Sequence, residues 1–383
     1  MFSFEVIHAS AAARAGRIVT DHGEVATPVF MPVGTAGSVK GVTPDQLAAC
    51  GTRMILANTY HLMLRPGSST VAALGGLHRF MAWDKPILTD SGGYQVFSLA
   101  HLRRIDDEGV VFRSHIDGRE APLTPAGAVE IQRLLGSDVI MQLDQCPSGS
   151  ADRAEVAEAV RRSAEWAGLC RQAWLKAGCL APAGHGQALF GIQQGGTDRD
   201  LRAESAGRLV DLDLPGYAIG GLSVGEGREQ MLDVLEQADR LLPACKPRYL
   251  MGVGEPRDII QAVARGVDMF DCVLPTRNGR NAQAFTWSGR LRLRNAQLAG
   301  QSRPIDEGCD CYTCRNFSRG AMRHLFMAGE MLGPTLATIH NLRFFAQLTA
   351  AIREAIRQGD LERRAAQWLA AMDGCSELDN RDQ

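Results

Sequence analysis

FGIQQGGTDRDLRAESAGRLVDLDLPGYAIGGL, residues 190–222, is the stretch that decides the fold. It begins with a short apolar run that ends in small and polar residues, continues through a helix-like segment, and ends in a second run of the same kind. Strand, helix and strand in that order predict two parallel strands joined by a crossover helix. The expected fold class is therefore α/β.

Six more apolar runs rich in Val, Ile, Leu and Met bring the candidate strands to eight. The eight runs are 29–35, 54–60, 87–93, 139–144, 190–196, 217–222, 249–254 and 269–274. Helix signals lie between them: Thr124 with Pro125, then Ser150, then an amphipathic run at 228–242. Eight such units predict a (β/α)8 TIM barrel. An open doubly wound sheet is the alternative, but no strand is followed by the glycine-rich fingerprint of a Rossmann domain.

The composition favours a globular protein in a reducing compartment. The chain has 383 residues, of which 45% are hydrophobic, and that is enough apolar material for a sizeable core. There is no signal-peptide pattern and no apolar run of about eighteen residues, so we expect a cytoplasmic protein without a membrane span. Ten cysteines in that context indicate reduced thiols or metal binding. Only residues 374–383 have the composition of a flexible tail.

Aspartates end three of the predicted strands. Barrel chemistry lies on the loops after the carboxyl ends of strands, so Asp90, Asp144 and Asp271 should meet at one mouth. Each aspartate taken alone could instead be a turn former or a helix N-cap. Asp271 departs from that interpretation because it lies between Phe270 and Cys272, where a carboxylate is costly unless it is paired or used. We expect a catalytic role for Asp271.

A long connection, residues 91–137, separates the third and fourth predicted strands. It contains GVVFRSHIDGRE (109–120), which has the alternation of a β-hairpin with its turn at Asp117 and Gly118. We expect this insertion to form a lid or a wall of the substrate site.

CDCYTC, residues 309–314, places three cysteines within six positions. Three thiolates need a fourth ligand to make a tetrahedral zinc site, and a set of three cysteines and one histidine leaves no position for a water nucleophile. The expected ligands of this structural site are Cys309, Cys311, Cys314 and His340. We place His340 at the start of a helix over 339–356, with Cys272 and Cys375 as weaker rivals. Free cysteines grouped by chance, or an iron–sulfur cluster without a suitable fourth cysteine, are the alternatives.

Positive charge gathers around these cysteines. Residues 277–323 contain nine arginines against three acidic residues, although the net charge of the chain is -2. Such a run is usually a solvated face. Beside a zinc lobe near an active site, it favours contacts with nucleic-acid phosphates.

Six segments in order resemble the tRNA-guanine transglycosylases. They are ILTDSGGYQVFSL (87–99), FGIQQGG (190–196), YAIGGLSVGE (217–226), MGVGEP (251–256), MFDCVLPTRNGRN (269–281) and CDCYTC (309–314) with the later IHN (339–341). The resemblance runs from about Phe4 to about residue 355. It implies one barrel over residues 1–383, a zinc-binding subdomain at 277–345 with one structural Zn²⁺ per subunit, and a homodimer.

Members of this family exchange guanine at the wobble position of certain tRNA anticodons for a 7-deazaguanine, in queuosine biosynthesis. By position, the resemblance makes Asp271 the nucleophile on the ribose and Asp90 the general acid and base. A retaining double displacement of this kind keeps the ribose covalently bound while the bases exchange. Val224 and Cys146 resemble the bacterial members, so the expected incoming base is 7-aminomethyl-7-deazaguanine (preQ1).

The resemblance also assigns residues to the base itself. Asp144 would accept hydrogen bonds from the purine, and Gln194 with the backbone of Gly221 would address its carbonyl group. Tyr94 and Met251 would stack on the two faces of a base flipped out of the anticodon loop.

A further group of residues would contact the entering base and the tRNA. Leu222 would offer its carbonyl to the aminomethyl group, with Glu226 supporting that peptide. The expected RNA contacts are Thr276, Arg277 and Arg280. Two positions depart from the family pattern, since Gln145 stands where Glu is common and Glu255 where many members have Lys.

Three rival functions remain at this stage. A non-catalytic accessory subunit is disfavoured by the three retained aspartates. A Schiff-base aldolase needs a lysine at a strand end, and none of the four lysines lies at one. An archaeal-type enzyme carries additional C-terminal RNA-binding domains, for which we expect no room.

Overall fold

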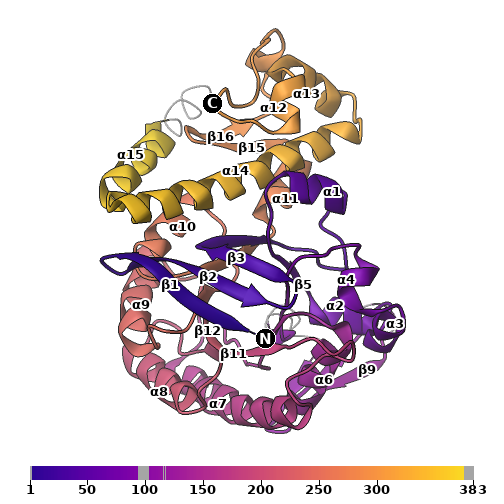
Figure 1. Ribbon diagram of the computed structural model, residues 1–383, viewed down its shortest axis with the longest axis vertical. Coiled ribbons are helices and arrows are strands. Elements are labelled where there is room, and N and C mark those ends of the chain that lie inside the picture. The colour runs from indigo at the N-terminus through magenta and orange to yellow at the C-terminus, as the bar shows by residue number, and fades with distance from the viewer. Residues whose placement is uncertain (1, 94–102, 115, 117, 375–383) are drawn as a thin grey trace.

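Eight parallel strands form a ring at the centre of the computed structural model (Figure 1). The structure describes residues 2–93, 103–114, 116 and 118–374. The barrel strands are β4 (Val29–Pro32), β5 (Ile55–Ala57), β6 (Ile87–Thr89), β10 (Val139–Met141), β11 (Ala188–Gln193), β12 (Gly216–Ile219), β13 (Arg248–Leu250) and β14 (Met269–Cys272). Their order is β4-β14-β13-β12-β11-β10-β6-β5, and a parallel bridge between Val33 and Leu56 brings the two ends together. The predicted (β/α)8 barrel is confirmed.

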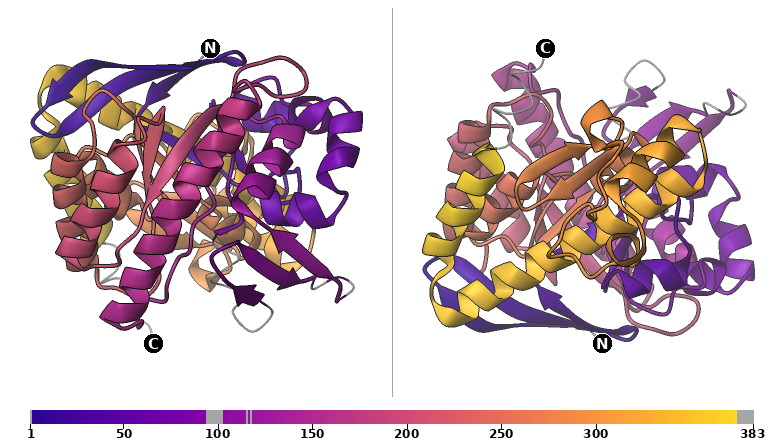
Figure 2. Two further views of the ribbon diagram at one scale, coloured as in Figure 1. Left: turned by 90° about the horizontal axis from the view of Figure 1, so that it is seen from below. Right: turned by 90° about the horizontal axis from the view of Figure 1, so that it is seen from above.

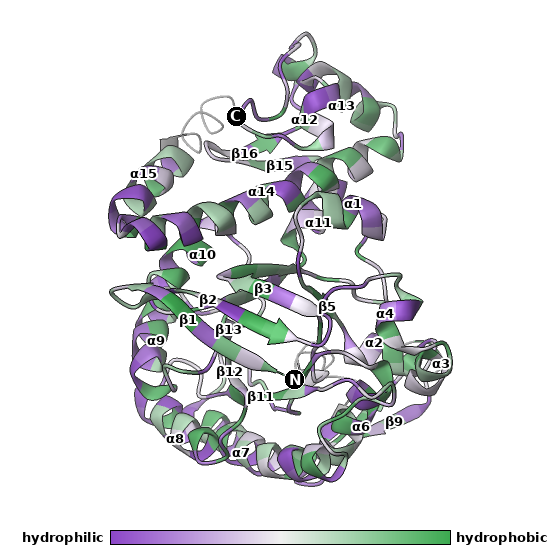
Figure 3. Ribbon diagram, in the orientation of Figure 1, coloured by the Kyte–Doolittle hydropathy of each residue, from purple (hydrophilic) through white to green (hydrophobic). Residues whose placement is uncertain are grey.

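Helices surround the ring, and Figure 3 shows them banded with polar and apolar residues, as expected for helices with one buried face. They are α1 (Pro44–Ala49), α2 (Thr59–Leu64), α3 (Ser68–Ala73), α4 (Gly76–Phe80), α6 (Pro125–Leu135), α7 (Arg153–Lys176), α8 (Arg199–Val210), α9 (Arg228–Leu241), α10 (Pro256–Val263) and α11 (Leu274–Arg280). Thr124 caps α6 as predicted. The prediction for Ser150 is wrong: Asp152 is the cap of α7, because its carboxylate accepts from the backbone N–H of Glu155 at 2.9 Å.

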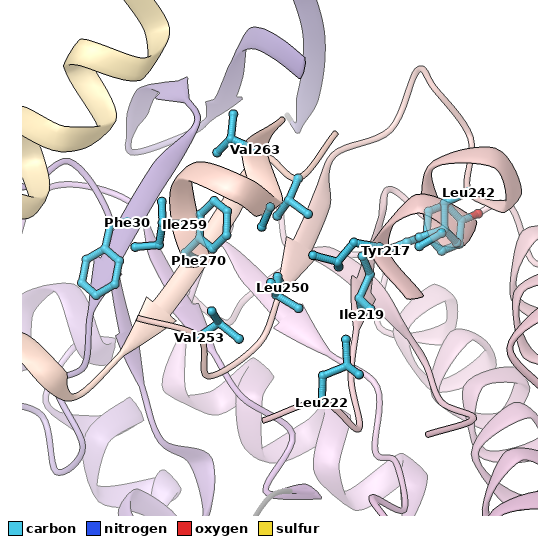
Figure 4. Close-up of a cluster of buried hydrophobic side chains, with 14 of the residues drawn as sticks. Phe30, Tyr217, Ile219, Leu222, Leu242, Leu250, Val253, Ile259, Val263 and Phe270 are labelled. Atoms are coloured by element: carbon cyan, nitrogen blue, oxygen red, sulfur yellow. The ribbon is translucent and has the colours of Figure 1, made fainter. Parts of the chain in front are cut away.

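Alternation along the strands divides the core into two layers. On β14, Met269 belongs to the cluster inside the ring, whereas Phe270 belongs to the cluster between the ring and the helices. Figure 4 shows this outer cluster, where Phe270, Leu250 and Ile219 lie together. Because side chains alternate along a strand, Asp271 comes next on the inner face, at the mouth of the barrel.

An antiparallel sheet that the sequence analysis did not predict crosses the amino-terminal end of the barrel, in indigo in Figure 1. Its strands are β1 (Ser3–Ser10), β2 (Ala13–Thr20) and β3 (Gly23–Thr27). The ring of Phe2, just before β1, lies 5.6 Å from the ring of Phe190 inside the barrel. Arg14 Nε donates to Asp268 Oδ1 at 3.2 Å, and both side chains are buried. The sheet therefore closes this end of the barrel.

The insertion at the opposite end forms a second antiparallel sheet, and Figure 2 shows the two sheets on opposite sides of the molecule. Its strands are β7 (Arg103–Ile105), β8 (Val110–Arg113) and β9 (Glu120–Leu123). The predicted hairpin is confirmed in the pairing of β8 with β9, although Asp117 at its turn lies outside the described residues. Trp166 Nε1 on α7 donates to the carbonyl of Asp107 at 2.9 Å, which fastens this sheet to the barrel.

The last part of the chain builds a small lobe and then returns to the barrel (Figure 1). Its elements are β15 (Gln283–Thr286), β16 (Gly289–Arg292), the 3-10 helix η2 (Ala296–Leu298), α12 (Tyr312–Asn316), α13 (Arg319–Met327), α14 (Leu332–Gln358) and α15 (Leu361–Gly374). The helix that contains His340 begins at Leu332, so His340 lies inside it and not at its start. Further along α14, the ring of Phe345 lies 4.4 Å from that of Phe30 on β4.

The bounds of the zinc-binding subdomain, 277–345, stay a prediction. None of the helices in the described part of the chain is both long and apolar enough to cross a membrane.

Candidate active site and metal centre

A cavity of approximately 480 Å³ opens at the carboxyl ends of the barrel strands, and Asp90, Asp144 and Asp271 all line it. The three aspartates follow or end β6, β10 and β14. Parallel strands in a barrel present their carboxyl ends on one face, which is why residues so distant in sequence meet. The convergence of these carboxylates at one mouth is as the strand ends predicted.

Asp271 is held through one of its two carboxylate oxygens. Tyr249 Oη donates to Oδ1 at 2.6 Å, and the backbone N–H of Gly252 donates to the same atom at 2.8 Å. No other donor to this carboxylate lies in the described part of the chain, so Oδ2 keeps its lone pairs. Burial raises the pKa of Asp271, and the hydrogen bonds from Tyr249 and Gly252 oppose that shift. The arrangement fixes the orientation of the carboxylate and leaves one oxygen available for reaction.

Both carboxylate oxygens of Asp90 accept hydrogen bonds from the segment after β5. Asn58 Nδ2 donates to Oδ2 at 2.6 Å, and the backbone N–H of Thr59 donates to Oδ1 at 2.6 Å. Burial raises the pKa of Asp90 to about 6, against these hydrogen bonds, and the negative charge of Asp271 adds to the rise. A carboxyl with this pKa exchanges protons readily near neutral pH, as a general acid and base must.

Asp144 faces the same cavity with a different set of partners. Gln194 Nε2 donates to Oδ2 at 2.7 Å, and Ser91 Oγ donates to Oδ1 at 3.0 Å. Burial raises the pKa of Asp144 to about 6 in spite of both bonds. A Cβ atom at Gly93 would lie 1.9 Å from Asp144 Oδ1, so only glycine allows the backbone to pass this carboxylate.

Glycines also shape the floor of the cavity. Gly221 has φ +64°, and a Cβ atom there would lie 2.4 Å from Gln194 Oε1. The preceding carbonyl, of Gly220, accepts from Arg202 Nη2 at 2.8 Å, and Arg202 is fully buried. Burial lowers the pKa of Arg202 to about 10, so the guanidinium is still charged at neutral pH. Arg202 therefore fixes the peptide next to Gly221.

The loop from Leu222 to Glu226 forms one wall. Glu226 accepts hydrogen bonds from the backbone N–H groups of Ser223 and Val224, the second at 3.0 Å. Since the N–H of the 222–223 peptide is directed to Glu226, the carbonyl of Leu222 points the opposite way. Cys146 lies beside this loop, and burial raises the pKa of its thiol to about 12, so it is a neutral group.

The remaining predicted residues divide between the cavity and its surroundings. Met251 and Arg277 line the cavity, and Arg277 is exposed. Thr276 is buried, with its hydroxyl donating to the carbonyl of Val273 at 3.2 Å, and Arg280 is half-buried. Tyr94 lies outside the described residues.

The two departures from the family pattern both have partners. Gln145 Oε1 accepts from Arg162 Nη1 at 2.5 Å, and Glu255 pairs with Arg290 on β16. Glu255 thus connects the barrel rim to the arginine-rich lobe instead of offering a positive charge.

Three residues hold the functional groups in position but were not predicted from the sequence. They are Asn58, Tyr249 and Arg202. Asn58 and Tyr249 lie at or beside predicted strands, where their polar groups were a signal that could have been used. Arg202 resembles any surface arginine of a helix, and no sequence signal marks it as buried.

The predicted cysteine and histidine cluster is assembled in the lobe. Cys309, Cys311, Cys314 and His340 are all buried, and their ligand atoms lie within 4.8 Å of one another. His340 Nδ1 lies 3.2 Å from the sulfur of Cys314, while Nε2 lies 2.8 Å from the carbonyl oxygen of Phe285. That acceptor places the proton on Nε2 and leaves Nδ1 as a ligand, the usual arrangement around a bound zinc ion. Three thiols and one imidazole fit a tetrahedral zinc site.

The rival ligand Cys272 is not part of the cluster. Cys272 lines the cavity at the end of β14, and Cys375 lies outside the described residues.

Comparison with known proteins gives matches along nearly the whole chain. A family model described as "Queuine tRNA-ribosyltransferase" matches residues 9–374. A protein of that name from Sphingopyxis alaskensis is 54% identical over 360 residues, which are 94% of this chain and 95% of the relative. Its namesake from a strain of Thermus thermophilus is 53% identical over 358 residues, 94% of this chain and 91% of the relative. One from Moorella thermoacetica is 54% identical over 359 residues, 94% of each chain.

Proposed function

Because this chain belongs to the queuine tRNA-ribosyltransferase family, we propose that it exchanges guanine at the wobble position of a tRNA anticodon for preQ1, in queuosine biosynthesis. As a member of that family it is a tRNA-guanine pentosyltransferase. The observation that carries the proposal is the meeting of Asp90, Asp144 and Asp271 in one cavity. Base exchange needs a nucleophile for the ribose, a proton carrier for the bases and an acceptor for the purine edge, and each aspartate has the environment for one of these roles.

Asp271 is the proposed nucleophile. The carboxylate attacks the anomeric carbon of the ribose, the glycosidic bond to guanine breaks, and a covalent ribosyl ester forms. The hydrogen bonds from Tyr249 and Gly252 hold Oδ1, so Oδ2 is the attacking atom. The electron pair of the broken bond leaves with guanine.

Asp90 is the proposed proton carrier. In its acid form it protonates the departing guanine, and in its ionised form it removes a proton from the incoming base. The entering base then attacks the same carbon and displaces Asp271, which restores the starting configuration. A pKa of about 6 suits both steps, because neither form of Asp90 is scarce near neutral pH.

Asp144 is the proposed anchor of the purine ring. Its carboxylate accepts hydrogen bonds from the ring and amino groups, beside Gln194 and the backbone of Gly221. The carbonyl of Leu222, which is directed away from Glu226, receives the aminomethyl group of preQ1. We further propose that Val224, Cys146 and Met251 form the walls around the base. Tyr94 is proposed to stack on the face of the base opposite Met251.

The tRNA is proposed to lie across the cavity mouth and the arginine-rich lobe. Arg277 is exposed at the edge of the cavity, which suits contact with a phosphate near the flipped nucleotide. Arg280 and Thr276 are proposed to support this contact. Zn²⁺ bound to the four lobe residues would supply structural stability and no step of the reaction. A homodimer remains a proposal.

The deciding experiment follows labelled guanine into a tRNA transcript with guanine at the wobble position. We expect the wild type to incorporate label and Asp271→Asn to incorporate none, because an amide cannot form the ribosyl ester. Asp258→Asn, an aspartate outside the cavity on α10, is the matched control and should keep its activity. Equal incorporation by wild type and Asp271→Asn would show that the nucleophile is assigned wrongly. Binding of the transcript without incorporation by the wild type would favour an accessory subunit.

A further inference from the structure

Three histidines from separate elements gather at the amino-terminal end of the barrel. His22 lies in the turn between β2 and β3, His78 lies on α4, and His185 lies in the segment before β11. One ring nitrogen from each residue lies within 4.8 Å of the others. This end is opposite the cavity that holds the three aspartates, so the proposed base exchange makes no use of the cluster.

Each imidazole is anchored through one nitrogen. His22 Nδ1 lies 2.7 Å from Asp138 Oδ1, and His78 Nε2 lies 3.1 Å from Asp138 Oδ2. His185 Nε2 lies 3.1 Å from the carbonyl oxygen of Gly136. Since the acceptors are oxygens, these three nitrogens carry the protons and the opposite nitrogens carry lone pairs. A histidine that binds a metal ion has this same arrangement, with its second nitrogen donating to a carboxylate or a carbonyl.

The shared anchor is a buried carboxylate. Asp138 also accepts from the backbone N–H of Ile87 at 2.8 Å, so its position is fixed. Burial works to raise the pKa of Asp138, but the hydrogen bonds from His22 and His78 outweigh it, and the pKa lies well below its usual range. The carboxylate is therefore ionised, and it favours a positive charge beside the two rings.

The rings can be reached from solvent. The side chains of His22 and His78 are 24% and 12% exposed, and the two rings stack with their centroids 3.5 Å apart. His185 stands edge-on to His22 at 4.6 Å. Because the stacked rings are nearly parallel, their free lone pairs converge on one ion only after a ring tilts, and His22 is the more exposed of the two.

We propose that His22, His78 and His185 form a second metal site, for a divalent transition-metal ion such as Zn²⁺, Ni²⁺ or Co²⁺. Neutral imidazoles suit these ions, whereas Mg²⁺ and Ca²⁺ prefer oxygen ligands. The ion would connect the β2–β3 turn to α4 and to the segment before β11. The Asp21 carboxylate already accepts from the backbone N–H of Gly186 at 2.6 Å across the same contact. Binding should therefore stabilise the sheet that closes the barrel.

The test measures how many metal ions each protein molecule binds. Full-length protein without a polyhistidine tag is dialysed against Ni²⁺ or Zn²⁺, and bound metal is measured by elemental analysis. We expect wild type to hold one ion more than His185→Gln and one more than His78→Gln, while all keep the ion of the cysteine cluster. His8→Gln, at an exposed position on β1 of the same sheet, is the matched control and should keep the additional ion.

Two further measurements separate the sites and guard against misfolding. Co²⁺ at three histidines should give visible absorption bands without the thiolate charge-transfer band of the cysteine cluster. Ni²⁺ should raise the Tm of wild type and His8→Gln more than that of His185→Gln, because only bound metal stabilises the folded state. A wild type that binds one ion alone overturns the proposal whatever the variants do. So does an additional ion that both histidine variants retain while they still exchange bases.

Discussion

Burial raises the pKa of Asp144, so ionisation of this carboxyl lowers the free energy of unfolding. A variant at this position should reveal the effect. The pKa of Asp144 is about 6 in the folded protein, which is above the ordinary value of an aspartate in the unfolded chain. The free energy of unfolding therefore falls as pH rises through this interval, and at higher pH the ionised carboxylate destabilises the fold.

Asp144→Asn removes this pH dependence. We expect the variant to be more stable than wild type near pH 8, by on the order of 3 kcal/mol at most, and the difference to close near pH 4. Urea unfolding at both pH values measures it. A difference that stays constant with pH would mean that Asp144 does not bind its proton more tightly in the folded state.

Tyr249 should act on the reaction through Asp271. Its hydroxyl donates to the carboxylate at 2.6 Å and lowers the pKa that burial raises. In Tyr249→Phe the pKa of Asp271 should rise, so the acid limb of the pH profile of kcat/KM moves to higher pH. Loss of a hydrogen bond to a charged group should slow exchange by roughly tenfold or more. Tyr312→Phe, at an exposed position on α12, should leave the profile unchanged, and an unshifted profile in Tyr249→Phe would refute the positioning role.

At this scale the sequence reveals reactive groups better than their supports. Asp90, Asp144 and Asp271 were identified because they lie at the carboxyl ends of predicted barrel strands, where the chemistry of a barrel is found. Arg202 was missed because a hydrogen bond between distant segments leaves no local pattern. The burial of Arg202 follows from the packing of α8 on the strands, which no property of a single helix predicts.

The helix α14 serves two parts of the molecule. His340 donates through Nε2 to the carbonyl of Phe285 in the lobe, and Phe345 packs on Phe30 of the barrel. We expect His340→Gln to lose the lobe metal and to increase hydrogen exchange in residues 283–327. His324→Gln, at the end of α13 outside the cluster, should keep its metal. Equal metal content in both variants, measured by elemental analysis, would exclude His340 as a ligand.

Element type was easier to predict than element limits. All eight barrel strands were recognised, since a strand buried on both faces has a continuous apolar run. Helix ends were less certain: Asp152 and Ser150 are both good caps, and the choice depends on the turn that precedes α7. The sheet of β1 to β3 was missed because its outer strand has no continuous apolar run, and Ile7, His8 and Ala9 in that strand are all exposed.

For the whole molecule, one buried ion pair connects the closing sheet to the barrel. Arg14 donates to Asp268 and also to the carbonyl of Ala244 at 2.7 Å. Arg14→Ala should lower the free energy of unfolding by about 3–5 kcal/mol, because it leaves a buried carboxylate unpaired. Replacing both partners, as in Arg14→Met with Asp268→Leu, should cost less. Urea unfolding distinguishes the two, and a double variant less stable than the single one would contradict this explanation.

The molecule also divides its tasks between its two ends. The closing sheet and the histidine cluster lie at the amino-terminal end of the strands, and the cavity lies at the carboxyl end. Changes at the closed end are therefore expected to alter stability more than catalysis, as in other barrels.

The pairing of β4 with β14 has a consequence for synthesis on the ribosome. These neighbours are separated by more than half of the chain, from Val29 to Met269. The first barrel strand therefore emerges early and waits, with one edge unpaired, until the last has been translated. An unpaired strand edge invites aggregation. A nascent chain of this protein should depend on chaperones for most of its elongation. A stall in translation before residue 269 should leave the nascent chain especially prone to aggregation through the unpaired edge of β4.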